Sequence, residues 1–435
     1  MKKVMVISPY FVPMKVVGAK RALHFVRHLS EYQWSSAVMA LPEDHQKDNS
    51  LNSLIPDVPM WRGLRAGPFA RREDRKAQGA KNKVKSVYAA QNKQALSTTN
   101  GLKRFYNRTF NIFDRYTKFL PWVYRGALQF LEAQDCQVIY ASAGPFSALK
   151  LSTLLSKRTG LPLVLDLRDP WTIEPNYQAN RNRIGQWLTE WVERACFKQA
   201  SKIILNTEAS YRAYIATYQG VIPAERFAFI RNQFDPELYE PQADPPSSDG
   251  PFKIAYFGHL RPSKNSLLFL DAYRAWIDQY QRSPADTQVV MLGEIAHDDQ
   301  QKLIELKLDE YVSSAQPIPF PKAPSSLGSM DLMLDLMGPR HHLQISGKLY
   351  DYLACGRPIL SISPNEELDQ IYADTQAGQR VALSQPDIIQ ALEAQYQKKR
   401  SGESFTPNAE AIFQMSASPA TQKLAYIFDE VTRSS

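Results

Sequence analysis

The chain has 435 residues, of which 44% are hydrophobic and 22% are charged, a composition typical of a globular protein long enough for two domains. No stretch approaches the roughly 20 consecutive apolar residues that a transmembrane helix needs, so the sequence predicts none. Three scattered cysteines are too few for a disulfide framework or a zinc knuckle, which favours a reducing compartment, the cytoplasm.

The formal net charge of +8 is unevenly distributed along the chain. Residues 61–125 contain 16 lysines and arginines against three acidic residues, a local balance of +13, so the rest of the chain is at about −5. The positive charge therefore belongs to one segment, which we interpret as a basic insertion over residues 44–125.

The first predicted strand is Val4–Ser8. Its apolar run ends at Pro9, after one strand's length, so we interpret it as a strand and not as a signal peptide. Short β-branched runs then alternate with amphipathic helical segments, the pattern of βαβ units on a parallel sheet. The further strands predicted in this half are Ala37–Leu41, Val138–Ala141, Leu163–Leu167, Lys202–Asn206 and Phe227–Arg231.

A linker rich in proline, serine and glycine, residues 241–251, marks the clearest domain boundary. The alternation then restarts, with predicted strands at Lys253–Phe257, Gln288–Leu292, Asp331–Leu336 and Pro358–Ile362. Helices are predicted from about Lys264, at Asp298–Leu308 and at Gly347–Cys355. We expect residues 411–435 to form a final helix that packs back toward the N-terminal domain.

These elements predict an α/β protein with two Rossmann-like, doubly wound lobes, residues 1–240 and 252–410, facing a central cleft. Ligands of such sheets bind beyond the carboxyl ends of the strands. The most informative segment there is 345–360, in which Ser346 is a good N-cap and Gly356 a good C-cap for a short helix. Ser346, Gly347 and Lys348 at its N-terminus can hold an anion, and Asp351 can accept hydrogen bonds from ribose hydroxyls. An ordinary capped helix with a surface lysine and a surface aspartate is the alternative interpretation.

Five segments carry recognisable motifs. They are Lys348-Leu-Tyr-Asp-Tyr-Leu-Ala-Cys-Gly-Arg-Pro-Ile-Leu360, Phe257-Gly-His-Leu-Arg-Pro-Ser-Lys264, Ile230-Arg-Asn-Gln-Phe-Asp235, Ile7-Ser-Pro-Tyr-Phe-Val-Pro13 with the following Gly18, and Asp166-Leu-Arg-Asp-Pro-Trp171. The first resembles the Lys-x-x-Glu-Tyr-x-Ala-x-Gly-x-Pro-Ile signature of glycosyltransferase family four, and all five, in their order along the chain, resemble that family and its relatives, which have the GT-B fold. The resemblance covers nearly the whole chain outside the basic insertion.

The resemblance implies that the donor is a nucleotide-diphosphate sugar bound by the C-terminal lobe, with no other cofactor and no metal. Lys264 is expected to contact the diphosphate, and Asp351 occupies the position of the family's ribose-binding glutamate. The family's usual arginine after Gly258 is replaced by His259, and we expect Arg261 to substitute for it. Leu343 stands where the family has its first glutamate, so the sugar pocket is atypical.

The N-terminal lobe is expected to bind the acceptor, through Gly18, Gly144, Arg168 and Asp169. The family's sugar-contacting histidine near the position of Arg168 is absent. Asp166 and Asp169 are spaced like metal ligands, but we expect Arg168 between them to neutralise both. An ordinary turn at Gly144 is as good an interpretation as an acceptor site.

The resemblance implies a retaining glycosyltransferase acting on a saccharide or lipid-linked saccharide, as in bacterial surface polysaccharide synthesis. The basic insertion, with its interleaved aromatic residues, suggests an enzyme that docks on the anionic inner face of a membrane. A solvated basic loop is the alternative, and no recognisable nucleic-acid module accompanies it. Two other functions stay open: a nucleotide-sugar epimerase of the same architecture, and a non-enzymatic protein that binds anionic surfaces.

Overall fold

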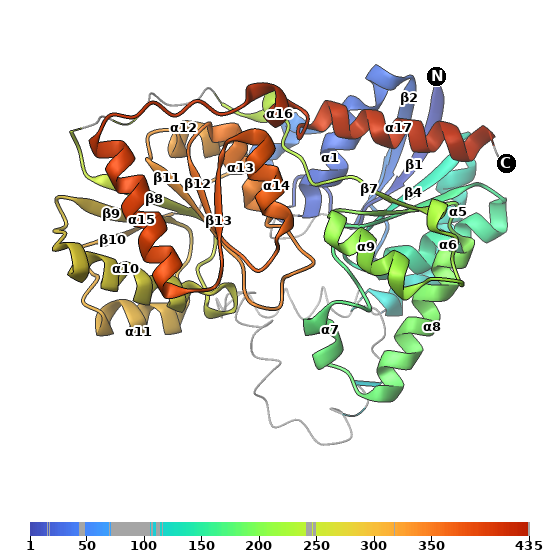
Figure 1. Cartoon of the computed structure of the whole chain (residues 1–435). Coiled ribbons are helices and arrows are strands. Elements are labelled where there is room, and N and C mark those ends of the chain that lie inside the picture. The colour runs from blue at the N-terminus through green and yellow to red at the C-terminus, as the bar shows by residue number, and fades with distance from the viewer. Residues whose placement is uncertain are drawn as a thin grey trace. The chain divides into compact units, whose positions relative to one another are not determined.

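The computed structural model of the protein describes residues 1–435 except 15, 17, 43–47, 69, 71–104, 106–107, 110–113, 115, 241–245, 247–248, 317 and 434–435. Much of the predicted basic insertion and most of the linker 241–251 lie outside the described residues. The chain divides into two compact units (Figure 1). Unit 1 comprises Met1–Asn206, Tyr211–Ile230 and Thr421–Ser435, and unit 2 comprises Thr207–Ser210 and Arg231–Ala420.

Unit 1 contains a parallel sheet that has seven strands in the described part of the chain, in the order β3-β2-β1-β4-β5-β6-β7. The strands are β1 (Lys2–Ile7), β2 (Trp34–Met39), β3 (Met60–Trp61), β4 (Val138–Ala143), β5 (Leu163–Leu167), β6 (Lys202–Leu205) and β7 (Phe227–Phe229). The main helices are α1 (Gly18–His28), α5 (Leu120–Glu132), α6 (Ser147–Thr159), α7 (Pro175–Ala179), α8 (Arg183–Gln199), α9 (Glu208–Thr217) and α17 (Ala417–Arg433).

The central strands of unit 1 are covered on both faces, which explains their continuous apolar sequences. Every residue of β4 and β5 is buried. On one face, Phe25 of α1 and Phe428 of α17 each contact Tyr140 of β4 edge-on, with ring centroids 5.9 Å apart. The alternate residues Ile139 and Ala141 face the other way and pack in a core with α5, α6 and α8. Helices on both faces thus bury the sheet.

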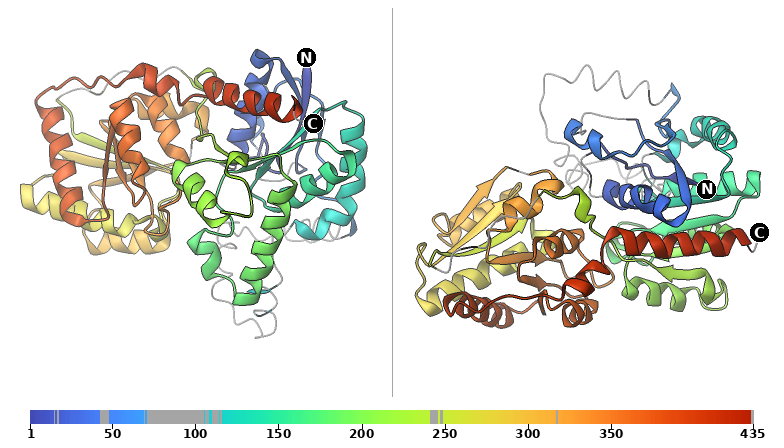
Figure 2. Two further views of the ribbon diagram at one scale, coloured as in Figure 1. Left: turned by 45° about the vertical axis from the view of Figure 1, so that its right-hand side comes forward. Right: turned by 90° about the horizontal axis from the view of Figure 1, so that it is seen from above.

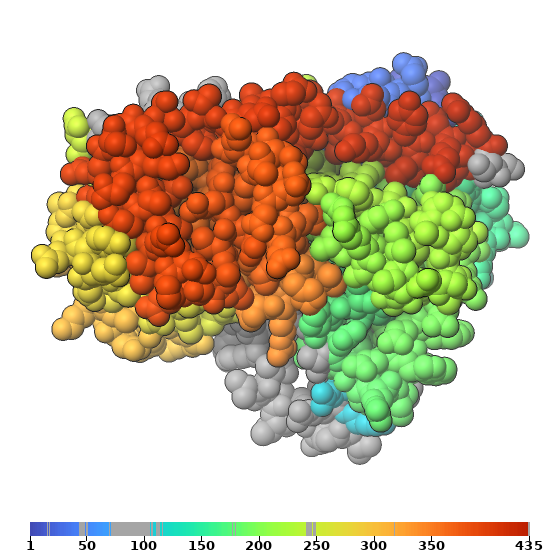
Figure 3. Space-filling view, viewed as in Figure 1, coloured from blue at the N-terminus to red at the C-terminus, as the bar shows by residue number. Residues whose placement is uncertain are grey.

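The last helix, α17, packs on unit 1 although the segment before it belongs to unit 2. Phe428 lies edge-on to Trp34, with ring centroids 5.3 Å apart. Asp429 is 2.8 Å from the Lys2 ammonium. Figure 2 shows α17 lying along unit 1 in both views, and in Figure 3 its red surface borders the light green surface of the same unit. The C-terminal residues therefore complete the core of the N-terminal unit.

Unit 2 contains a second parallel sheet, with six strands among the described residues, in the order β10-β9-β8-β11-β12-β13. These are β8 (Phe252–Phe257), β9 (Thr287–Leu292), β10 (Val312–Ala315), β11 (Leu332–Leu336), β12 (Ile359–Ile362) and β13 (Gly378–Val381). Its helices include α10 (Ser266–Tyr280), α11 (His297–Glu305), α12 (Ala323–Leu327), α13 (Gly347–Cys355), α14 (Glu367–Thr375), α15 (Gln385–Arg400) and α16 (Ala409–Phe413).

Both sheets have the strand order of the Rossmann fold, which confirms the predicted fold class of two Rossmann-like, doubly wound lobes. The direction of winding reverses between β1 and β4 in unit 1, and between β8 and β11 in unit 2. At such a switch point the loops that follow the two strands diverge and leave room for a ligand. Ligand-binding residues are therefore expected in the loops after β1, β4, β8 and β11.

Three strands were not predicted, and all are short strands at sheet edges: β3, β10 and β13. Each has one hydrogen-bonded neighbour and is at most half-buried, so its sequence lacks the apolar run of a central strand. Among the described residues, no helix combines the length and the hydrophobicity needed to cross a bilayer.

Candidate functional site

Three segments of unit 2 meet at its switch point. They are the loop after β8, residues 258–265, the loop after β11, residues 337–346, and the N-terminus of α13. The motifs that predicted donor binding lie on these segments. The two loops are close together because they follow the carboxyl ends of the adjacent strands β8 and β11. Side-chain contacts of Lys348 with Tyr256 and of Lys264 with Met337 join the three segments.

Lys348 reaches from α13 to the loop after β8. Its ammonium is 3.2 Å from the hydroxyl of Tyr256 and 4.7 Å above the ring of the same residue. Gly258 has a φ of +118°, and a Cβ atom there would lie 2.9 Å from Cε of Lys348. Glycine at 258 therefore permits both the left-handed backbone and the close passage of the lysine stem.

Lys348 is half-buried and carries its charge at neutral pH. Burial lowers the pKa of its ammonium, but Tyr256 and the buried Asp335 of β11 oppose that effect, and the net pKa is raised. A fixed cation at this place attracts an anion to the end of the sheet.

Lys264 approaches the loop after β11. Its ammonium is 3.5 Å from Sδ of Met337, and the side-chain amide of the next residue, Asn265, donates to the Met337 carbonyl at 2.9 Å. Gly338, in the loop after β11, packs tightly against the loop after β8, since a Cβ atom at Gly338 would lie 2.1 Å from the carbonyl oxygen of Ser263. These contacts fix Lys264 at the junction of the two loops.

The N-terminus of α13 is capped as predicted from its sequence. Ser346 is the N-cap, and its hydroxyl accepts a hydrogen bond from the amide of Lys348 at 3.2 Å. No hydrogen bond within the described part of the chain uses the amide of Gly347. The helix dipole and this amide favour an anion at the same end of the sheet as Lys348.

His259 lies close enough to Arg261 and Lys348 for both cations to affect its pKa. Burial lowers the pKa of His259; Glu294, 3.5 Å from its Nδ1, opposes the shift, while Arg261 and Lys348 add to it. His259 is therefore a neutral imidazole at pH 7, which can donate or accept a hydrogen bond without adding charge.

Asp351 is almost fully buried on α13, and its carboxylate accepts a hydrogen bond from the hydroxyl of Tyr239. Burial, reinforced by the carboxylate, raises the pKa of Tyr239, so the phenol stays protonated as a donor. Because an ionised carboxylate can accept more than one hydrogen bond, Asp351 can hold Tyr239 and still accept from a ribose hydroxyl, the contact expected from the sequence.

In unit 1, three of the four predicted acceptor residues converge on one guanidinium. A Cβ atom on Gly18 would lie 1.6 Å from Nη1 of Arg168, and one on Gly144, where φ is +99°, would lie 3.0 Å from its Nη2. Arg168 also binds the carboxylate of Asp169 at 3.1 Å, and Asp169 is half-exposed. Gly18 begins α1 and Gly144 follows β4, so this cluster lies at the switch point of unit 1.

The expectation that Arg168 neutralises both Asp166 and Asp169 was wrong for Asp166. Asp166 is completely buried and binds Arg21 through two hydrogen bonds of 2.7 and 2.9 Å. Tyr140 also donates to Asp166. Asp166 is the fourth of the five buried residues of β5, and because side chains in a strand alternate in direction it faces the same side of the sheet as Tyr140, whereas Asp169 follows the strand and reaches solvent.

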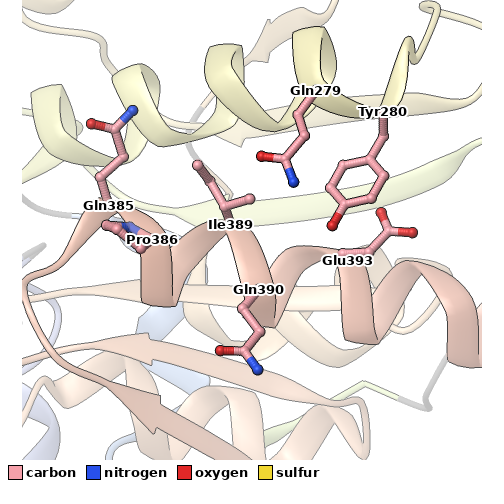
Figure 4. A pocket seen from close by; sticks show the side chains of 7 residues that line it. All are labelled: Gln279, Tyr280, Gln385, Pro386, Ile389, Gln390 and Glu393. Atoms are coloured by element: carbon pink, nitrogen blue, oxygen red, sulfur yellow. The ribbon is translucent and has the colours of Figure 1, made fainter.

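A pocket of about 470 Å³ lies apart from these clusters, between α10 and α15 (Figure 4). Glutamine side chains, Tyr280 and Glu393 line it. Its one acidic group is paired, because Glu393 binds Arg282 at 3.0 Å and accepts from the indole of Trp276 at 2.9 Å. No cation points into the pocket from its lining residues, so it does not suit a phosphate.

Sequence reasoning missed Tyr256 and Met337, which contact the two candidate lysines. Both lie within or directly after strands, where their sequence suggests only core packing. The signal that finds them is the strand order, which makes β8 and β11 neighbours.

The sequence matches no family model and no curated protein. The structure is similar to that of Alr3699/HepE of Anabaena in complex with UDP and glucose, at 16% identity and a TM-score of 0.63, over 99% of this chain and 100% of that one. A glycosyltransferase of Rickettsia africae gives 11% identity and a TM-score of 0.62, over 100% and 99% of the two chains. A UDP-N-acetylglucosamine 2-epimerase gives 12% and 0.54, over 100% and 98%. At these identities the similarity establishes the GT-B fold.

Proposed function

We propose that the protein is a glycosyltransferase that moves a sugar from a nucleoside diphosphate sugar to a saccharide or lipid-linked saccharide. The observation that carries the proposal is the cluster at the switch point of unit 2. There, Lys348 passes over Gly258, Lys264 lies at Met337, and the N-terminus of α13 faces the same end of the sheet. Two cations and a helix N-terminus suit a diphosphate better than a neutral ligand.

The reaction breaks the bond between the anomeric carbon and the diphosphate oxygen, and forms a bond from that carbon to an acceptor oxygen. Negative charge grows on the departing diphosphate, and the acceptor hydroxyl gives its proton to an oxygen of that diphosphate. Lys348, Lys264 and Arg261 stabilise that charge, and positioned charges of this kind typically contribute several kcal/mol to catalysis. Because these cations serve the role that a metal plays in other enzymes, we propose metal-independent transfer.

We further propose retention of configuration, which rests on the resemblance of residues 348–360 to family four. The donor is proposed to be a UDP-sugar, since the Alr3699/HepE structures hold UDP, or UDP-glucose. Gly18, Gly144, Arg168 and Asp169 are proposed to bind the acceptor, because they gather at the switch point of unit 1.

The proposed cellular role is bacterial surface polysaccharide synthesis at the inner face of the membrane. It is supported by the charge of +13 over residues 61–125, which favours an anionic surface and hence a lipid-linked acceptor.

A nucleotide-sugar epimerase is the second candidate function, favoured by the similarity to the UDP-N-acetylglucosamine 2-epimerase. The two functions differ in what the enzyme releases. A transferase releases UDP only when an acceptor is present, whereas an epimerase changes the donor sugar without needing an acceptor.

The test is a panel of nucleotide sugars incubated with wild-type protein, with and without saccharide and lipid-linked acceptors. We expect UDP release that depends on the acceptor, and a product whose anomeric configuration, read by NMR, equals that of the donor. An altered donor sugar without UDP release would establish the epimerase instead.

A further inference from the structure

Helix α8 carries an exposed apolar face that the transferase reaction does not use. Ile184, Trp187 and Trp191 lie at helical spacing on one side of the helix, and their exposed fractions are 54%, 61% and 61%. Figure 1 and Figure 2 show the N-terminal half of α8 extending away from the sheet of unit 1. Two exposed indoles and an isoleucine side by side form a patch that water solvates poorly.

The opposite face of α8 is firmly fixed to unit 1. Glu193 is fully buried and accepts hydrogen bonds from the hydroxyls of Tyr214 at 3.0 Å and Tyr218 at 2.6 Å. Cys196 and Phe197 pack in the core of the same unit. The helix therefore presents its outer face rigidly, and rotation of the helix cannot bury the two tryptophans.

Positive charge accompanies the apolar face. Arg183, Arg194 and Lys198 are exposed on α8 against one exposed acidic residue, Glu190. Thr109, a described residue of the basic stretch 61–125, also contacts the residue that precedes this helix. The Asn182 amide donates to the Thr109 hydroxyl at 2.6 Å.

Exposed tryptophans beside positive charge favour an anionic lipid bilayer as the partner. Tryptophan prefers the boundary between hydrocarbon and water, where its ring is buried and its N–H remains hydrated. Lysine and arginine near that boundary are attracted to anionic lipid headgroups. A second copy of this chain bound through the same face would bring Arg183, Arg194 and Lys198 of both copies together, which opposes self-association.

We propose that the outer face of α8, formed by Ile184, Trp187 and Trp191, docks unit 1 on an anionic lipid bilayer by inserting both indoles into the interface. This goes beyond the proposed transferase reaction and does not rest on it, because docking is measurable without donor or acceptor.

The test is flotation of the full chain with vesicles of phosphatidylcholine containing about a third phosphatidylglycerol. We expect the variant W187A/W191A to bind at least about tenfold more weakly than wild type, since two large apolar side chains lose their interfacial burial. The matched control is I304A/Y426A, which removes two apolar side chains that are 61% and 74% exposed on other helices. Its binding should stay within about twofold of wild type.

A second readout detects insertion itself. Brominated lipid should quench the tryptophan fluorescence of wild type, and the quenching should fall in W187A/W191A. Thermal melting shows whether each variant is folded. The proposal is overturned if wild-type protein does not float with anionic vesicles at low salt, or if W187A/W191A floats as wild type does. It is also overturned if sedimentation shows a wild-type dimer that W187A/W191A dissociates. Release of UDP is assayed separately, so a failure of either proposal is visible without the other.

Discussion

Replacing Lys348 by methionine removes the charge at the switch point of unit 2 while keeping the stem that passes over Gly258. We expect the variant to fold and its kcat to fall by about 10²- to 10³-fold. A unit charge about 4 Å from a developing phosphate charge contributes about 4 kcal/mol at an effective dielectric constant near 20. Partial solvation of this half-buried ammonium reduces that to about 3 to 4 kcal/mol, and each 1.36 kcal/mol corresponds to a tenfold change in rate.

The assay is acceptor-dependent UDP release under saturating donor, with Lys322→Met as the matched control. Lys322 is 55% exposed in the same unit, and its loss should leave kcat unchanged. Lys348→Arg keeps the charge but not the compact ammonium, and we expect a loss of roughly tenfold. A Lys348→Met variant that is folded, by its melting temperature, and retains more than about half of the wild-type kcat would show that Lys348 does not stabilise the leaving diphosphate.

Lys264→Ala should lower kcat by about 10²-fold in the same assay; unchanged activity would place Lys264 outside the site. Asp351→Asn should raise the donor KM more than it lowers kcat, because the carboxylate contacts ribose. An unchanged KM, together with equal losses of melting temperature in Asp351→Asn and Tyr239→Phe, would instead assign Asp351 a structural role. Excess EDTA should leave the rate unchanged, and activity lost to EDTA but restored by Mg²⁺ or Mn²⁺ would disprove metal independence. The pKa of His259 is lower in the folded protein than in the unfolded chain, so protonation of His259 favours unfolding. Wild type should therefore lose stability relative to His259→Asn as pH falls below 6.5. Melting temperatures of the two proteins that change in parallel from pH 7 to pH 5 would contradict this.

The central strands of both sheets could be predicted because a strand that is buried on both faces has a continuous apolar sequence. Leu163–Leu167 is buried throughout, and its apolar run is visible without any knowledge of its neighbours. The edge strand Gly378–Val381 is half-buried at every position, and its residues indicate a strand only once β12 lies beside it.

The candidate site could be located but not assembled from the sequence. Capping by Ser346 is local, so the sequence predicts it. The pairing of Lys348 with Tyr256 joins residues 92 positions apart, and that of Arg21 with Asp166 joins residues 145 apart. Such pairs depend on the strand order, which a hydrophobic pattern does not specify. The assignment of Asp166 to Arg168 failed for this reason.

The most direct test of the account is equilibrium binding of UDP, measured by calorimetry without acceptor. Wild type should bind UDP at one site per chain, and uridine at least about 100-fold more weakly, because the cations at the switch point of unit 2 recognise the diphosphate. The double variant Lys264→Met/Lys348→Met should bind UDP no better than wild type binds uridine. Equal affinity of wild type for UDP and uridine, or wild-type affinity for UDP in the folded double variant, would contradict the proposed donor site.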